Sequence, residues 1–313
     1  MDLMNSNQSK YHHIIITAAF LAVIIIWSTT PIAIKWSGEG VSYIFGIVMR
    51  MSIGAVLAVT LVLLKYKKLE MNKASRQVYI ASALAIFGGM MPVYWGAQYI
   101  SSGLISVVFG LSPIVTGYFA WKFIHENGFN KLKIIGSLAG LIGLLIIFYK
   151  GISAGEDYIY GVLAVLSAVI FHSISAVWIK SIKTEVPPLS LVAGGLLFSM
   201  PLFFTVYLIF APPLPVEIPL KAIWSIVYLG VVGSVLGFVS YYYLLKHLPA
   251  SSVALITLIT PISALWIGHA VNDEIISVSI YVGTTFVLMG LALHQGEDIL
   301  YKKLWRKRKH FYG

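Results

Sequence analysis

Residues 101–143 read SSGLISVVFGLSPIVTGYFAWKFIHENGFNKLKIIGSLAGLIG, and residues 250–290 read ASSVALITLITPISALWIGHAVNDEIISVSIYVGTTFVLMG. Both stretches begin with small residues and then carry a proline, a glutamate and two glycines among apolar runs. These landmarks are Pro113, Glu126, Gly136 and Gly143 in the first stretch and Pro261, Glu274, Gly283 and Gly290 in the second. The proline precedes the glutamate by 13 residues both times, and the two glycines are 7 residues apart both times. Equal spacing in two apolar helix pairs predicts a chain built by internal duplication.

The composition of the chain predicts an integral membrane protein. Hydrophobic residues make up 58% of its 313 residues and charged residues 11%, with a mean hydropathy of +0.87, whereas an average soluble domain has about 25% charged residues. In a soluble protein, the formal net charge of +10 would suggest a nucleic-acid partner. Here the basic residues lie between apolar spans, so we expect them to contact anionic lipid headgroups and expect no nucleic-acid partner. The absence of cysteine excludes disulfides and thiolate metal sites.

Ten apolar runs are long enough to cross a bilayer, which takes about 17–20 residues. They lie at residues 14–34, 42–64, 78–98, 102–124, 132–149, 160–179, 189–210, 222–245, 250–270 and 276–295. Backbone polar groups in lipid must find partners within the chain, and these runs are continuous rather than alternating, so they predict helices and not strands. The expected fold is therefore all-α, with ten transmembrane helices.

The positions of lysine and arginine predict how the helices are oriented. With the N-terminus inside, the cytoplasmic gaps hold 18 of the 22 basic residues, the outer gaps hold Lys35, Lys150 and Lys221, and Arg50 lies within a span. Both termini are therefore expected in the cytoplasm. Five helices per half is an odd number, so the second half enters from the opposite side and the duplication is inverted. The predicted parts are a cytoplasmic N-terminus (1–13), two repeats (14–149 and 160–295) and a basic cytoplasmic tail (296–313).

These features together resemble the drug/metabolite transporter superfamily, in its ten-helix EamA-type branch. The resemblance rests on Trp27-Ser28 before Lys35, on Arg50 in the second span, and on the repeated proline, glutamate and glycine landmarks. It implies a secondary carrier of small metabolites in the bacterial inner membrane, often an exporter of amino acids or related compounds, with a central cavity between the halves. Such sequences often have Gly after the first-span Trp and Asn two places further, where this chain has Ser28 and Thr29. A role for that Asn therefore does not carry over.

Arg50 is the strongest single candidate for binding a substrate. It lies nine residues into its span, which at 1.5 Å per residue is about 13 Å below the outer surface. A charge at that depth costs about 2.5–3.5 kcal/mol on insertion scales, so the side chain should face protein or a wet cavity. Two interpretations stay open: a fixed cation for an anionic group such as a carboxylate, or a structural tie that donates hydrogen bonds to neighbouring helices.

His172 is the second ionisable residue within the spans. Its helix face carries the small residues Ala168, Ser175 and Ala176, which let another helix or a cavity approach closely. A histidine titrates near neutral pH and could couple transport to protons; the alternative is a neutral hydrogen bond between helices. Glu126 and Glu274 lie at helix ends and are interpreted as caps or loop anchors.

Prolines interrupt five of the predicted helices, and each removes a backbone donor and frees a carbonyl one turn back. They are Pro31, Pro92, Pro113, Pro201 and Pro261, of which Pro31, Pro113 and Pro261 are candidate hinges. The paired prolines are the best placed for unwound points, although static kinks are an equal alternative. Ser112 and Thr260, just before them, could satisfy freed carbonyls or bind a substrate.

Aromatic residues make up 13% of the chain, and most should form interfacial belts. The candidates for a site are Trp27, the pair Tyr94-Trp95, and Tyr242 within a run of three tyrosines. Tyr94 and Tyr242 are related by the same offset of 148 residues as the paired prolines, which suits two gates or two belts.

No enzyme signature is present: the chain has no phosphate-binding loop, no His-x-x-x-His pair and no Gly-x-Ser-x-Gly turn. Transport against a gradient would therefore draw on an ion or substrate gradient, and no cofactor is expected. The alternatives left open are a drug or lipid-precursor flippase of the same fold and a membrane enzyme acting on lipids. We expect a monomer or a weak homodimer.

Overall fold

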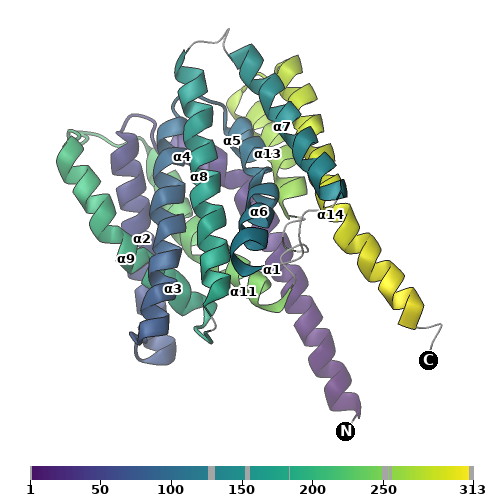
Figure 1. The fold of residues 1–313 in the computed structure, drawn as a ribbon. Helices are drawn as coiled ribbons and strands as arrows, with labels where there is room; N and C mark the ends of the chain where they lie inside the picture. Colours follow the sequence, from purple (N-terminus) through teal and green to yellow (C-terminus); the bar gives the residue numbers. More distant parts are fainter. Residues whose placement is uncertain are drawn as a thin grey trace.

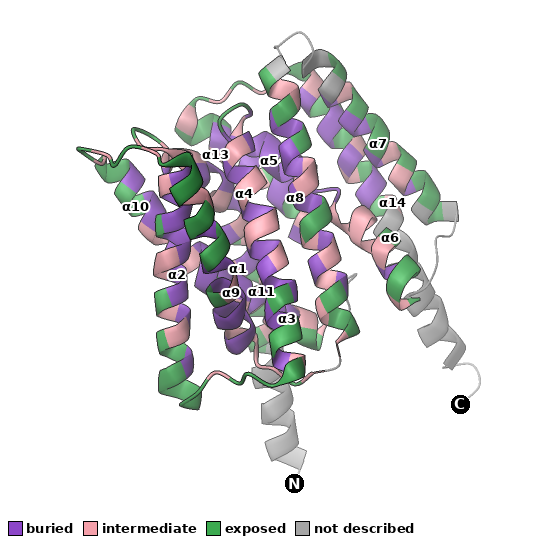
Figure 2. Ribbon diagram, turned by 60° about the vertical axis from the view of Figure 1, so that its left-hand side comes forward, coloured by how far each residue is buried: buried purple, intermediate pink, exposed green. Residues whose placement is uncertain are grey.

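The computed structural model describes residues 2–125, 131–151, 156–182, 184–248, 253 and 256–309, and these ranges contain helices and no strand. The helices form one bundle, and α1 begins and α14 ends beyond the same end of it (Figure 1). We call the opposite end, where α1 finishes, the remote end. Buried residues follow the faces where helices meet, and exposed residues cover the outer faces (Figure 2).

The described residues of the first half form seven α-helices and one π-helical segment, and those of the second half form further α-helices and a second π-helical segment. The first set is α1 (Asp2–Trp36), α2 (Tyr43–Tyr66), α3 (Lys73–Ala83), η1 (Leu84–Gly89), α4 (Met90–Gly96), α5 (Ser102–Phe109), α6 (Ser112–Ile124) and α7 (Lys131–Gly151). The second set is α8 (Glu156–Ser181), α9 (Pro188–Phe210), α10 (Leu220–Tyr228), η3 (Leu229–Gly237), α11 (Phe238–His247), α13 (Ile256–Asn272) and α14 (Val278–Lys309).

Seven stretches of the described chain are long and apolar enough to cross a membrane. They are Ile14–Trp36, Tyr43–Tyr66, Lys73–Gly96, Ser102–Ile124, Asp157–Ser181, Pro188–Phe210 and Leu220–His247. The other three predicted spans coincide with α7, α13 and α14; α13 has 17 residues, and the apolar parts described in α7 and α14 are Ile134–Ile147 and Val278–Leu293. The all-helical prediction is confirmed, whereas ten crossings and cytoplasmic termini stay predictions.

Short polar side chains start several helices. Ser42 accepts a hydrogen bond from Ile44 N at the start of α2, and Ser101 accepts one from Leu104 N at the start of α5. Such caps satisfy backbone donors that have no partner inside the helix. The remote-end turns are therefore defined by local sequence as well as by packing.

The two π-helical segments occupy equivalent places in the two halves. The offset of 148 residues maps η1 (84–89) onto 232–237, which lies inside η3. Each segment lies in the middle of a continuous span and is followed by the paired tyrosine, Tyr94 or Tyr242. π-helical turns are rare and concentrate at functional sites, because the extra residue per turn redirects side chains.

The paired prolines have different surroundings. The fourth predicted span breaks at the turn Gly110–Leu111, and Pro113 occupies the first turn of the new helix α6. Pro261 instead lies inside α13, and Pro31 lies inside α1. The chain is thus interrupted at Pro113 but helical through the other two, and their hinge roles stay a prediction.

The repeated glycines bring α7 and α14 into close contact, and the two helices lie side by side in Figure 1. A Cβ atom on Gly143 would collide with the Gly283 carbonyl, one on Gly283 with the Gly143 carbonyl, and one on Gly290 with the Gly136 carbonyl. Residue numbers rise in one helix as they fall in the other, so the helices run antiparallel here. Exchanging the two repeats maps this pairing onto itself, as a two-fold axis requires, and the contact therefore supports the inverted duplication.

Candidate functional site

Arg50 lies inside the bundle, on α2, with 1% of its surface exposed. Its Nε donates a hydrogen bond of 3.0 Å to Ser234 Oγ on η3, and its Cζ lies 5.8 Å from the centre of the Tyr94 ring. A Cβ atom on Gly233 would lie 3.3 Å from Arg50 Nη2, so this glycine leaves room for the guanidinium. The π-helical segment η3 therefore forms the wall against which Arg50 is held.

One guanidinium nitrogen of Arg50 has an unused donor. Nη1 is buried and has no hydrogen-bond partner among the described residues, and no ion pair of Arg50 occurs among them. Leaving a buried charged donor unsatisfied costs more than a neutral one, at least about 1–3 kcal/mol. The structure therefore shows Nε as a tie between helices and Nη1 as a buried donor without a partner among the described residues.

Three aromatic side chains from both halves surround His172 and form a cluster of four rings with it. The four residues are Trp27 on α1, Phe109 on α5, His172 on α8 and Tyr241 on α11. The His172 ring centre lies 6.3 Å from that of Trp27, 6.3 Å from that of Phe109 and 5.8 Å from that of Tyr241. Trp27 and Tyr241 are 5.0 Å apart. All four side chains are half-buried, so the cluster can offer ring faces to a ligand.

The segment η3 links Arg50 to this cluster. Its Ser234 contacts Arg50, and its last residue, Gly237, faces Trp27: a Cβ atom there would lie 3.7 Å from the indole Nε1. Arg50 and Trp27 are thus held by one short stretch of chain, and we treat Arg50 and the cluster as one candidate site.

The paired tyrosines are both interior residues. Tyr94 is 1% exposed and Tyr242 7% exposed, whereas a tyrosine of an interfacial belt faces lipid. The Tyr94 ring faces Arg50, and its hydroxyl accepts a long hydrogen bond of 3.5 Å from Ser37 Oγ. The Tyr242 hydroxyl lies 3.3 Å from Ser82 Oγ in the other half of the molecule. Their burial argues against the belt interpretation for these two residues.

The remaining predicted site residues lie outside the aromatic cluster. Trp95 is half-buried and its ring centre is 5.2 Å from that of Tyr99, near the remote end. Ser112 Oγ is buried without a hydrogen-bond partner among the described residues, at the break before α6. Thr260 is buried in α13, and its neighbour Pro261 packs near Gly110 in the same break. The structure does not bring these residues into ring contact with His172.

Sequence reasoning missed three contributors to the site. Phe109 and Tyr241 complete the ring around His172, and Ser234 holds Arg50. Tyr241 stands within the predicted tyrosine run, but the pattern did not say which of the three faces inward. Thr29, where similar sequences often have Asn, donates or accepts a 2.6 Å hydrogen bond with the Tyr228 hydroxyl and joins α1 to α10.

The described residues contain no group of three or more His, Cys, Asp or Glu side chains that could hold a metal ion. The chemistry that the site can offer is therefore one buried guanidinium, several ring faces and a few hydroxyls. Such a set is typical of sites that bind small molecules.

The curated relatives of this chain include proteins described as uncharacterized transporters. An uncharacterized transporter, YoaV of Bacillus subtilis strain 168, is 26% identical over 276 residues, which are 88% of this chain and 94% of that protein. An uncharacterized transporter of Archaeoglobus fulgidus is 27% identical over 85% of this chain and 93% of its own. Protein PagO of Salmonella typhimurium is 24% identical over 83% and 87%.

The fold also occurs in a solved structure. A crystal structure matches 89% of this chain and 96% of its own with a TM-score of 0.65 and 19% sequence identity, a likeness that concerns the fold alone. The model of the EamA-like transporter family matches the chain twice, at residues 13–149 and 159–294. The two matches cover nearly all of the chain, so this protein belongs to the EamA-like transporter family and is a membrane transporter.

Proposed function

We propose that the protein is a secondary transporter of small metabolites that works by alternating access, with its substrate site at Arg50 and the aromatic cluster. The observation that carries this proposal is that side chains from both repeats converge on His172 and are held together with a buried cation. Alternating access moves two repeats around a fixed central site, which must therefore be built from both of them.

The chemistry of the site favours amino acids or related compounds as substrates. The unpaired Nη1 of Arg50 would donate hydrogen bonds to a carboxylate, since arginine and carboxylate form strong, charge-assisted hydrogen bonds. The rings of Trp27, Phe109 and Tyr241 would contact an apolar or aromatic part of the same molecule. We propose export as the direction of transport and the bacterial inner membrane as the location.

The energy source follows from what the chain contains. The sequence has no phosphate-binding loop, so we infer that transport uses an ion or substrate gradient. His172 is the candidate for coupling to protons because it lies at the centre of the cluster, between the two repeats. Its ring contacts in the described chain are with Trp27, Phe109 and Tyr241.

The experiment is flux in proteoliposomes containing the purified protein. Labelled amino acids, their amides, cationic drugs and lipid precursors are compared, with and without a pH gradient. We expect carboxylate-bearing compounds to be transported and their amides to be transported at least about 10-fold more slowly, because the amide lacks the charge-assisted bond to Arg50. Equal rates for acids and amides would refute the role of Arg50, and flux of lipid precursors alone would favour a flippase.

A further inference from the structure

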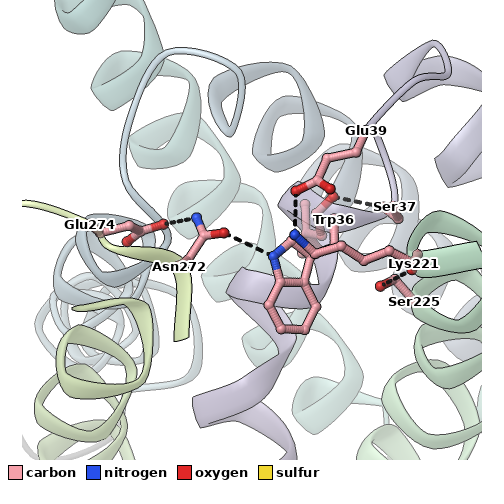
Figure 3. A network of polar contacts seen from close by, with 8 residues as sticks. Trp36, Ser37, Glu39, Lys221, Ser225, Asn272 and Glu274 are labelled. Carbon is pink, nitrogen blue, oxygen red and sulfur yellow. Dashed lines mark hydrogen bonds and ion pairs between the residues drawn. The ribbon is translucent and has the colours of Figure 1, made fainter. Parts of the chain in front are cut away.

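A chain of polar contacts joins the two repeats at the remote end of the bundle (Figure 3). Lys221 Nζ lies 2.9 Å from Glu39 Oε1 and 4.6 Å from the centre of the Trp36 ring. Trp36 Nε1 donates a 3.0 Å hydrogen bond to Asn272 Oδ1. Asn272 Nδ2 in turn donates to Glu274 Oε1 at 3.3 Å. Trp36 and Glu39 belong to the first repeat, and the other three residues belong to the second.

Glu274 carries the chain of contacts onward to the start of α5. Its carboxylate accepts hydrogen bonds from Ser102 N at 3.0 Å, Ser102 Oγ at 2.9 Å and Gly103 N at 3.3 Å. These backbone donors have no partner within the helix, and a carboxylate at a helix N-terminus is stabilised by the helix dipole. Gly268 permits this approach, because a Cβ atom there would lie 2.5 Å from Glu274 Oε2.

The turn after α1 packs against the start of α10 in the same region. Gly40 has a φ of 72°, and a Cβ atom on it would lie 2.8 Å from Pro219 Cγ. Directly beneath these contacts, Ser37, Ile100 and Ser102 are fully or almost fully buried. The rings of the candidate site, deeper in the bundle, are half-buried. The contacts at the remote end therefore adjoin a fully buried layer, whereas the rings of the candidate site are only half-buried.

We propose that Trp36, Glu39, Lys221 and Asn272 form the remote gate of the transporter, which is closed in this structure and opens when the end of α1 and the turn after it move away from α10 and α13. The proposal rests on the proposed transport function and adds the residues that control access to the site. Glu274 stays bound to α5 when the gate opens, because its carboxylate accepts three partly buried hydrogen bonds from the start of that helix. The Glu39–Lys221 and Trp36–Asn272 contacts are the parts that break.

The strength of these contacts suits a gate that must open in every cycle. The side chains of Lys221 and Glu39 are 46% and 43% exposed, so water and salt screen their ion pair. An exposed pair of this kind shifts an equilibrium by only about 2- to 5-fold. Several such contacts together favour the closed gate, yet each one is weak enough to break in every transport cycle.

The test is the reactivity of a buried thiol on this cysteine-free chain. Ser37→Cys places the reporter directly under the gate, and its maleimide labelling rate is measured on the purified full-length protein in detergent. Labelling of a buried thiol follows the population of the open state. We expect Lys221→Met and Trp36→Phe each to raise this rate about 2- to 5-fold and the double variant about 10-fold.

Two controls separate gate opening from general loosening. The ion pair Lys246–Glu185, 3.0 Å long, joins α11 to the turn before α9 at the opposite end, and Lys246→Met should not raise labelling at position 37. A second reporter, Ser199→Cys, is buried in α9 away from the gate and should label at an unchanged rate in every gate variant.

An unchanged labelling rate in a double variant that keeps the melting temperature of the parent would overturn the gate. If Trp36→Phe does not fold, Asn272→Ala removes the same hydrogen bond from the other side. A parallel rise at position 199 would also overturn the proposal, because the effect would then be global. No substrate is needed, so a responsive gate in a protein that moves no metabolite would count against the proposed function alone.

Discussion

Arg50 makes two kinds of contact, and they should control different measurable properties. The hydrogen bond from Nε to Ser234 joins α2 to η3, so it contributes to stability whether or not substrate is present. The unpaired Nη1 contributes nothing until an anionic group reaches it. A buried cation with an unsatisfied hydrogen-bond donor is energetically costly in a membrane, and such residues usually have a function. For Arg50, that function would be to bind a carboxylate.

Substituting Arg50 separates the two properties. Arg50→Lys keeps the charge but loses the planar fork, so carboxylate binding should weaken without vanishing. Arg50→Met keeps much of the side-chain length and loses the charge, so affinity for carboxylate substrates should fall about 10- to 100-fold. Both variants should melt at lower temperature, because the hydrogen bond from Arg50 Nε to Ser234 is lost. The measurements are substrate affinity and melting temperature on the same purified variants.

Arg76→Met is the matched control, because Arg76 is an exposed arginine of α3 and its removal should change neither property. An Arg50→Met protein that is destabilised yet binds substrate with unchanged affinity would leave Arg50 as a helix tie only. The substrate site would then rest on Trp27, His172 and the rings around them.

The sequence predicted where the membrane-spanning helices lie but not their irregular segments. Hydrophobic runs located the spans, because a bilayer imposes length and continuity on them. The π-helical segments η1 and η3 were not predicted, since an extra residue per turn depends on what packs against the helix rather than on local preference. The same reason explains the missed Ser234: its position next to Arg50 exists only after α2 and η3 have packed.

The candidate site was predicted in part for a similar reason. Trp27, Arg50 and His172 were visible as polar or amphipathic residues in apolar runs, where they need a special environment. Phe109 is an ordinary apolar residue of a membrane helix, and only the fold places it beside His172. Pro113 and Pro261 have equal sequence spacing yet different structures, because a proline is tolerated either at the first turn of a helix or as a kink within one.

At the scale of helix pairs, the glycine contact between α7 and α14 gives a direct test of the duplicated motif. Gly143→Ala should destabilise the protein by about 1–3 kcal/mol, because its methyl group would collide with the Gly283 carbonyl and the helices would have to separate. Gly89→Ala is the control, since no atom beyond its own stretch of helix lies within 4 Å of the Cβ position there. Thermal unfolding in detergent measures both. Equal melting temperatures for the two variants would contradict the tight packing.

For the molecule as a whole, the distribution of charge and the contacts at the remote end point to the same orientation. Of the three basic residues predicted outside, Lys221 pairs with Glu39, and Lys35 Nζ donates to the Ile100 carbonyl at 2.9 Å. Both lysines thus make contacts within the remote end of the bundle. Most of the remaining basic residues lie in segments predicted to face the anionic lipid of the cytoplasmic side. We therefore predict that the remote end faces outward and that both termini are cytoplasmic.

Single cysteines on this cysteine-free chain test that orientation in intact cells. Val216→Cys lies in the turn between α9 and α10, where the side chain is fully exposed, and an impermeant maleimide should label it from outside. Glu70→Cys lies in the exposed turn between α2 and α3, at the other end, and should react only after the membrane is permeabilised. Position 75 is unsuitable as a reporter because Ser75 is fully buried. Inverted membrane vesicles should give the opposite pattern, with Glu70→Cys labelled and Val216→Cys protected. Labelling of Glu70→Cys in intact cells would reverse the predicted topology and turn the remote gate into a cytoplasmic one, leaving the contacts that form it unchanged.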